Sequence, residues 1–178
     1  HAQQNAFIEN LLSTCLYEGV AEFISCKVTG TPSDAPAIEF GKANQKAIID
    51  KFVSDLFIMS NNYNWMWGEN RNELKVRDLG YYVGYEICER YYNLSANKEK
   101  AIKELIELDY TNEKEVERIV DITRLLPKTL EALYNDYEKQ RPTVIGLSAF
   151  ENGSQAVKPG LTRITVTFSE PLLKYNTG

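Results

Sequence analysis

Residues 77–92 read RDLGYYVGYEICERYY, and this stretch predicts how the main helices pack. Asp78 stands where a side chain can cap the free amides of a first helical turn, so we expect a helix to begin there. Gly80, Gly84 and Cys88 follow one another at four-residue steps. Small residues at this spacing lie on one side of a helix and allow a second helix to approach closely. The stretch therefore predicts a helix in close contact with another helix.

The sequence before this stretch predicts two further helices separated by a loop. Apolar residues recur at the three- and four-residue spacing of an amphipathic helix over residues 5–28, and again over residues 44–59. Residues 29–41, TGTPSDAPAIEFG, are rich in Pro, Gly and small polar residues, which is typical of a loop. Residues 60–73 interrupt the helical pattern again.

The sequence after this stretch predicts three more helices. An amphipathic pattern covers residues 97–108, and Thr111 or Asn112 is placed to begin the next helix. Pro127 fits a first helical turn better than a helix interior, so we expect it to divide that helix from a last one that ends near Gln140. We therefore expect a mainly α fold up to this point.

The pattern changes after Pro142, where two strands are predicted. In the segment LTRITVTF, apolar residues alternate with Thr and Arg, and the segment TVIGLSAF precedes it across the turn sequence ENGS. Alternation with a period of two is typical of half-buried strands, so we expect strands near residues 143–149 and 162–168.

Two strands do not make an independent sheet domain, because an isolated hairpin is only marginally stable in water. The strands therefore either dock on the helices or belong to a sheet that continues beyond Gly178. We expect a helical domain over residues 1–141, with its N-terminal part missing, and the start of a β domain over residues 142–178.

Composition excludes several classes of function. The chain has 20 basic and 25 acidic residues and a net charge of −5, a balance that gives no reason to expect nucleic-acid binding, which requires a basic surface. No apolar run reaches the roughly 20 residues of a membrane-spanning helix. The three cysteines, Cys15, Cys26 and Cys88, do not have the spacing of a zinc knuckle or a disulfide framework, and we expect them in the core.

One phrase in the first predicted helix is typical of a metal site. A catalytic zinc ion takes three protein ligands and leaves one position open for water. In the HExxH class, two histidines come from one helix, and a glutamate between them is the general base. The third ligand is often a glutamate on a later helix, in a phrase such as EGxA. Residues 18–21 read EGVA, and His1 stands where the second histidine of HExxH would be.

These residues carry a family resemblance. The phrases EGVAEF, residues 18–23, and DLGYYVGYEI, residues 78–87, together resemble the predicted zinc-dependent proteases of Bacteroidetes-type bacteria, a gluzincin-like group, over roughly residues 1–110. The resemblance implies a multi-helical metallopeptidase domain that uses Zn and metal-activated water to hydrolyse a peptide or protein substrate. It also implies that His1 and Glu18 bind the metal. Glu22 is the alternative ligand, because its distance from His1 in the sequence is closer to the family's usual gap.

The chain departs from the family pattern at its start. No His-Glu pair precedes His1, so one ligand and the general base are absent. We therefore expect the chain to associate with a missing N-terminal part of the same protein, and to hydrolyse no peptide when assayed alone.

The resemblance also implies a donor to the oxyanion that forms during peptide hydrolysis. Tyr81, Tyr82 and Tyr85 are the candidates, and we select Tyr82 and Tyr85, which lie on a similar face of the predicted helix. The alternative is that these tyrosines are packing residues.

The predicted strands resemble the opening of bacterial immunoglobulin-like (Ig-like) domains, which have a PTV strand, an NG turn and an ITVTFSEP strand. Such modules are common on secreted or surface-anchored proteins, so the resemblance implies a periplasmic, cell-surface or secreted location. Two functions remain open: part of a zinc metallopeptidase, or a non-catalytic extracytoplasmic binding or scaffold domain.

Overall fold

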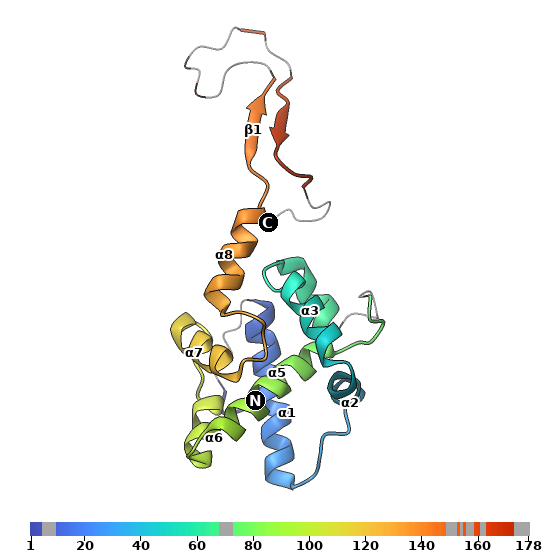
Figure 1. The fold of residues 1–178 in the computed structure, drawn as a ribbon, viewed down its shortest axis with the longest axis vertical. Helices are drawn as coiled ribbons and strands as arrows, with labels where there is room; N and C mark the ends of the chain where they lie inside the picture. Colours follow the sequence, from blue (N-terminus) through green and yellow to red (C-terminus); the bar gives the residue numbers. More distant parts are fainter. Residues whose placement is uncertain are drawn as a thin grey trace. The chain divides into compact units, whose positions relative to one another are not determined.

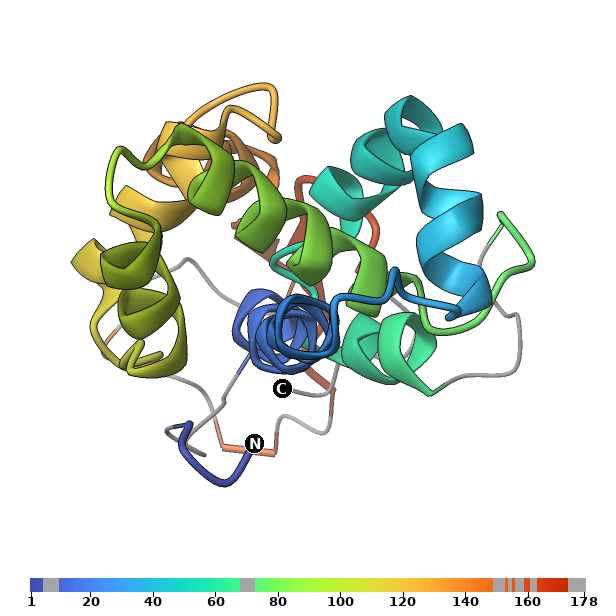
Figure 2. The ribbon, with the colours of Figure 1, turned by 90° about the horizontal axis from the view of Figure 1, so that it is seen from below.

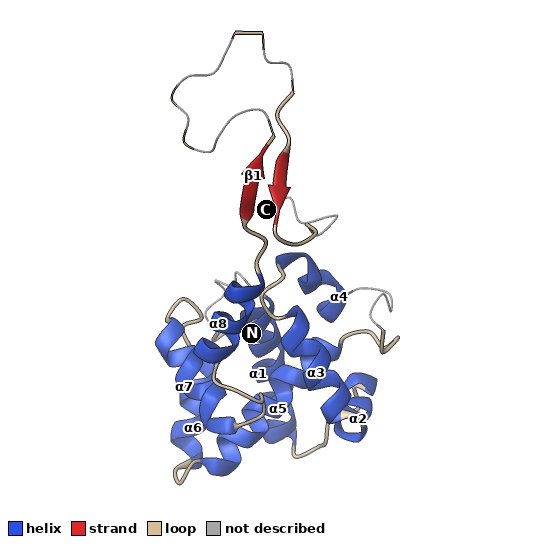
Figure 3. Cartoon of the chain, turned by 45° about the horizontal axis from the view of Figure 1, so that its top comes forward, coloured by secondary structure: helices blue, strands red, loops and turns tan. Residues whose placement is uncertain are grey.

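The computed structural model describes residues 1–4, 10–67, 73–148, 153, 155, 159–160 and 163–172. These residues contain eight α-helices and a two-stranded antiparallel sheet near the C-terminus (Figure 3). The prediction of a mainly helical fold followed by a strand pair is confirmed. The chain divides into two units, residues 1–134 and 135–178. The predicted domain boundary at residue 141 stays a prediction.

Helix α1 (Leu11–Thr29) begins at a capping box. The Asn10 side chain accepts a hydrogen bond from the Ser13 amide at 2.9 Å, and the Ser13 hydroxyl accepts one from the Asn10 amide at 3.1 Å. The helix is followed by Gly30, whose φ of 70° lies in the left-handed region that favours glycine. The predicted helix over residues 5–28 is thus confirmed from Leu11, and its first turn falls on residues 5–9, outside the described residues.

Helix α5 (Leu79–Leu94) packs directly against α1, as the small residues predicted. Figure 1 shows α5 crossing α1, and Figure 2 looks nearly along the axis of α1, with α5 in green running past it. A Cβ atom on Gly84 would lie 1.8 Å from the Cys15 carbonyl oxygen, and one on Gly19 would lie 2.2 Å from the Gly84 carbonyl carbon. Only glycine fits at these two positions, and the backbones of the two helices touch there.

Asp78 precedes α5 as predicted, but it does not cap the helix with its side chain. Its backbone is left-handed, with φ 62°, and its carboxylate accepts a hydrogen bond from Arg77 Nε at 2.9 Å. The predicted cap was wrong because the left-handed backbone is not the extended conformation from which an N-cap side chain reaches the helix amides.

Three short helices and a 3₁₀ turn fill the stretch between α1 and α5. They are α2 (Pro36–Ala43), α3 (Gln45–Asp55), the 3₁₀ turn η1 (Met59–Asn61) and α4 (Asn62–Met66). The prediction of a loop over residues 29–41 was wrong from Pro36 onward, because proline at the first helical position has the φ that a helix start needs. The predicted helix over residues 44–59 ends earlier, at Asp55.

Helices α6 (Lys98–Ile106), α7 (Glu113–Thr123) and α8 (Leu130–Gln140) follow α5. The side chains of Asn97 and Asn112 cap α6 and α7, which confirms two of the predicted helix starts. Pro127 is not in a first helical turn. It lies in the connection between α7 and α8, and the Thr129 hydroxyl accepts a hydrogen bond from the Ala132 amide at the start of α8.

The core of the first unit is made of apolar and aromatic side chains from all of its long helices. Phe52 is fully buried and packs edge-on against Trp65, with ring centroids 5.1 Å apart. The Trp65 indole donates a hydrogen bond to the buried Asp55 carboxylate at 3.0 Å. Cys15 and Cys88 are buried as predicted, and burial raises the pKa of both thiols.

The second unit contains an antiparallel hairpin. Strand β1 (Val144–Leu147) pairs with β2 (Val166–Phe168), in a register that places Leu147 opposite Val166 and includes an irregularity between Val144 and Gly146. The described parts of both predicted strands are shorter than expected, and Ile145 is 64% exposed. Among the described residues, no helix is long and apolar enough to cross a membrane.

Candidate metal centre

Glu18 lies near the middle of α1, at the place where α1 meets α5. Gly19 beside it contacts the α5 backbone at Gly84. The side chain is only 16% exposed, whereas the side chain of His1 is 45% exposed. The packing of the two helices therefore holds this carboxylate at a partly buried position.

The segment at the start of the chain brings His1 to this carboxylate. His1 Nε2 lies 3.3 Å from Glu18 Oε2. The imidazole ring stacks on Tyr17 of α1, with ring centroids 4.4 Å apart and an angle of 21° between the planes. Two of the residues singled out in the sequence are thus in direct contact.

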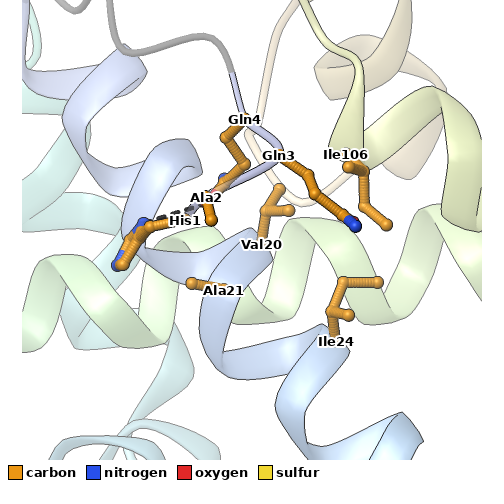
Figure 4. A pocket seen from close by; sticks show the side chains of 8 residues that line it. All are labelled: His1, Ala2, Gln3, Gln4, Val20, Ala21, Ile24 and Ile106. Carbon is orange, nitrogen blue, oxygen red and sulfur yellow. Dashed lines mark hydrogen bonds between the residues drawn. The ribbon is translucent and has the colours of Figure 1, made fainter.

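Two neighbouring side chains hold this pair. The other ring nitrogen of His1, Nδ1, lies 2.9 Å from Gln4 Oε1, as the dashed line in Figure 4 marks. Burial and a hydrogen bond to Glu18 raise the pKa of Tyr81, which belongs to the first turn of α5. His1 and Glu18 each have a second partner besides one another.

The distance between His1 and Glu18 fits two ligands of one zinc ion. Zinc binds imidazole nitrogen at about 2.0–2.1 Å and carboxylate oxygen at about 2.0–2.2 Å, which at a tetrahedral angle puts the two ligand atoms roughly 3.3–3.5 Å apart. The observed separation is 3.3 Å. The same contact also suits an ion pair in which a proton on His1 takes the place of the metal.

Among the described residues, His1 and Glu18 are two possible zinc ligands, which is fewer than a catalytic zinc site needs. Within residues 1–4, 10–67, 73–148 and 163–172, no group of three or more His, Cys, Asp or Glu side chains is arranged to hold a metal ion. A catalytic zinc site takes three protein ligands. The pair therefore fits part of such a site.

Glu22, the alternative ligand, has a different partner. It lies one helical turn after Glu18 on α1, and its carboxylate accepts a hydrogen bond from the Ser33 hydroxyl, in the connection between α1 and α2. The structure brings Glu18 to His1 and brings Glu22 to Ser33.

Tyr82 and Tyr85 also have other partners. The Tyr82 ring is fully buried against Gly41, its hydroxyl lies 2.9 Å from Gln45 Nε2, and burial raises its pKa to about 12. The Tyr85 hydroxyl donates to Glu89 at 3.2 Å. The hydrogen bonds of the described residues bring neither hydroxyl to His1 or Glu18.

Tyr81 is the tyrosine that reaches the pair, and the selection of Tyr82 and Tyr85 passed over it. Tyr81 flanks the small residues that contact α1, since it follows Gly80 directly and precedes Gly84 by three residues. Tyr85 flanks them as well, and the sequence contained nothing to separate the two.

A hollow lies between the first residues and α1, next to His1. Its volume is about 240 Å³. Figure 4 shows the side chains that line it: His1, Ala2, Gln3, Gln4, Val20, Ala21, Ile24 and Ile106. The α1 and α6 side of the hollow is apolar.

Comparison with known proteins identifies a protein family. A family model described as "Predicted Zn-dependent protease (DUF2268)" matches residues 3–114, more than half of the chain. The matched range includes Gln4, Glu18 and Tyr81, and His1 lies two residues before it. No curated protein and no solved structure matches.

Proposed function

Because the chain belongs to the predicted Zn-dependent protease family, we propose that it is the C-terminal portion of a zinc metallopeptidase that hydrolyses peptide bonds. His1 and Glu18 are two of the zinc ligands in this proposal. The single observation that supports it best is the 3.3 Å contact between His1 Nε2 and Glu18 Oε2, which has the separation of two ligand atoms on one zinc ion.

Each side chain at the site has a distinct task. His1 presents Nε2, and Glu18 presents a charged oxygen. Gln4 holds the far side of the imidazole, and the Tyr81 hydroxyl donates to the carboxylate and orients it. A bound zinc ion polarises a carbonyl and lowers the pKa of a water molecule, which makes that water a nucleophile at neutral pH.

The remaining chemical groups come from outside these residues in our proposal. A His-Glu pair preceding His1 supplies the third ligand and the base that removes a proton from water. The substrate is a peptide or protein. The immunoglobulin-like sequence of the strands supports a location outside the cytoplasm.

The test compares two glutamates on the same helix in the full-length protein. Glu18→Gln removes a charged ligand oxygen while keeping the size of the side chain, so we expect lower zinc content and loss of peptidase activity with an unchanged circular dichroism spectrum. Glu22→Gln is the matched control, one helical turn away and bonded to Ser33. It is expected to keep both zinc and activity.

Other outcomes reassign the site or reject it. If zinc content by mass spectrometry falls for Glu22→Gln and not for Glu18→Gln, the ligand is Glu22. If neither substitution changes zinc content or activity, the metallopeptidase proposal fails for this segment, and a non-catalytic binding or scaffold role takes its place.

A further inference from the structure

Gln4 contacts three different groups with one carboxamide. Its Oε1 lies 2.9 Å from His1 Nδ1, and its Nε2 lies 2.9 Å from the Tyr17 carbonyl oxygen and 3.2 Å from the Tyr110 hydroxyl. Tyr17 belongs to α1, and Tyr110 belongs to the connection between α6 and α7. The amide is therefore held by two elements of the helical unit while it contacts the ring of His1.

These contacts fix which end of the amide faces His1. A backbone carbonyl accepts hydrogen bonds and never donates them, so the group next to the Tyr17 carbonyl is the Gln4 NH₂. The amide oxygen then faces His1 Nδ1. Because an amide oxygen only accepts, Nδ1 is the nitrogen that donates and carries a proton.

The proton on Nδ1 determines what Nε2 can do. In a neutral imidazole, one nitrogen carries the proton and the other has a free lone pair. With the proton on Nδ1, Nε2 keeps its lone pair and lies 3.3 Å from the Glu18 carboxylate, which is also an acceptor. Two acceptors at this distance repel unless a cation joins them, and either a metal ion bound to Nε2 or a second proton on the ring removes this repulsion.

We infer that Gln4 is a positioning residue that selects Nε2 of His1 as the metal-binding nitrogen, and that Tyr110 and the Tyr17 carbonyl hold its amide in the required orientation. The inference rests on the proposed function, because it deepens the role given there to His1. Tyr110 is 7% exposed and its ring packs edge-on against Tyr17, with centroids 6.1 Å apart, so this support is itself buried.

The sequence makes a direct test feasible, since His1 is the single histidine of the chain. In ¹⁵N NMR spectra its two ring nitrogens are thus the only imidazole signals. The chain of residues 1–178 is titrated with zinc chloride, with its terminal amine acetylated so that the amine and Nδ1 do not chelate the metal together. In the unsubstituted chain, we expect zinc to shift Nε2 while Nδ1 keeps its proton.

The variants change the partner of Nδ1. Gln4→Leu removes the acceptor, and we expect zinc to distribute between Nδ1 and Nε2 with an affinity about 10–100-fold lower, as is usual when the outer partner of a metal-bound histidine is lost. Gln4→Glu restores an acceptor and is expected to restore binding through Nε2. Tyr110→Phe removes one anchor of the amide and is expected to have a smaller effect than Gln4→Leu. Gln3→Leu, at the exposed neighbouring glutamine, is the control and is expected to have no effect.

The outcomes separate this inference from the proposed function. If zinc binds Nε2 with the same affinity in Gln4→Leu as in the unsubstituted chain, the role of Gln4 is overturned and His1 remains a ligand. If neither nitrogen of His1 responds to zinc in the unsubstituted chain, the proposed ligand pair is overturned, and the role of Gln4 with it.

Discussion

Gly84 of α5 and Gly146 of β1 belong to two regions that differ in how strongly the surrounding residues constrain them. A Cβ atom on Gly84 would lie 1.8 Å from a backbone oxygen of α1, whereas one on Gly146 would meet nothing within 4 Å. The helical unit is stabilised by close packing of buried side chains around α1 and α5. The hairpin is held by its ladder and leaves Ile145 64% exposed. The same residue type thus indicates tight packing in one region and open space in the other.

The largest expected effect comes from removing a core side chain of the helical unit. Phe52 is fully buried, so Phe52→Ala leaves a cavity beside Trp65. We expect the free energy of unfolding to fall by about 3–5 kcal/mol. Chemical denaturation followed by circular dichroism measures it.

The matched substitution in the hairpin is Ile145→Ala. Since Ile145 is mostly exposed, we expect a change within about 0.5 kcal/mol. Equal losses for the two variants would show that the two regions do not differ in packing as described.

The next effect in size concerns the glycine at the helix contact. Gly84→Ala improves the intrinsic helix propensity by roughly 1 kcal/mol, so any loss of stability has to come from the clash with the Cys15 carbonyl. We expect a net destabilisation of about 1–3 kcal/mol, as in overpacked cores.

Gly146→Ala is the control, because its added methyl group has open space. We expect its denaturation midpoint to match that of the unsubstituted chain. A Gly84→Ala variant as stable as Gly146→Ala would contradict the close approach of α1 and α5.

The smallest effect is expected from deleting the hairpin. A chain that ends at Arg141 keeps every described buried side chain, since no described residue after Arg141 is buried, so its free energy of unfolding should change by less than about 0.5 kcal/mol. A peptide of residues 142–178 should show no stable strand signal, because two strands alone are marginal in water. A large loss of helical stability on truncation would place the domain boundary elsewhere.

Local chemistry explains which helix ends the sequence predicted well. The helices predicted to begin at Asn97 and at Thr111 or Asn112 do begin there, because the Asn97 and Asn112 side chains cap the amides that follow them. Asp78 has the same kind of side chain, but it turns to Arg77 because its backbone is left-handed. Pro36 begins a helix inside a stretch whose composition is typical of a loop. In both cases the backbone angle φ of one residue decides whether a helix is capped or begins there, and the amino-acid composition of the segment does not predict that angle.

The sequence likewise indicated some residues of the candidate site and not others. The sequence drew attention to His1 and Glu18, but it left Glu18 and Glu22 as alternatives, because both have helical spacing and similar distances along the chain from His1. It also did not point to Gln4 or Tyr110, which lie 106 residues apart and meet only in the fold.

The sequence by itself determined the helical periodicity, several helix starts, the strand pair and the small residues at which α5 contacts another helix. These features depend on neighbours within a few positions along the chain. The tertiary structure alone decided which glutamate meets His1, which tyrosine donates to that glutamate, and which amide faces the imidazole. The contact of Tyr81 depends on how α1 and α5 pack where Gly19 meets Gly84, and the contacts of His1 and Gln4 depend on how the first residues lie against α1.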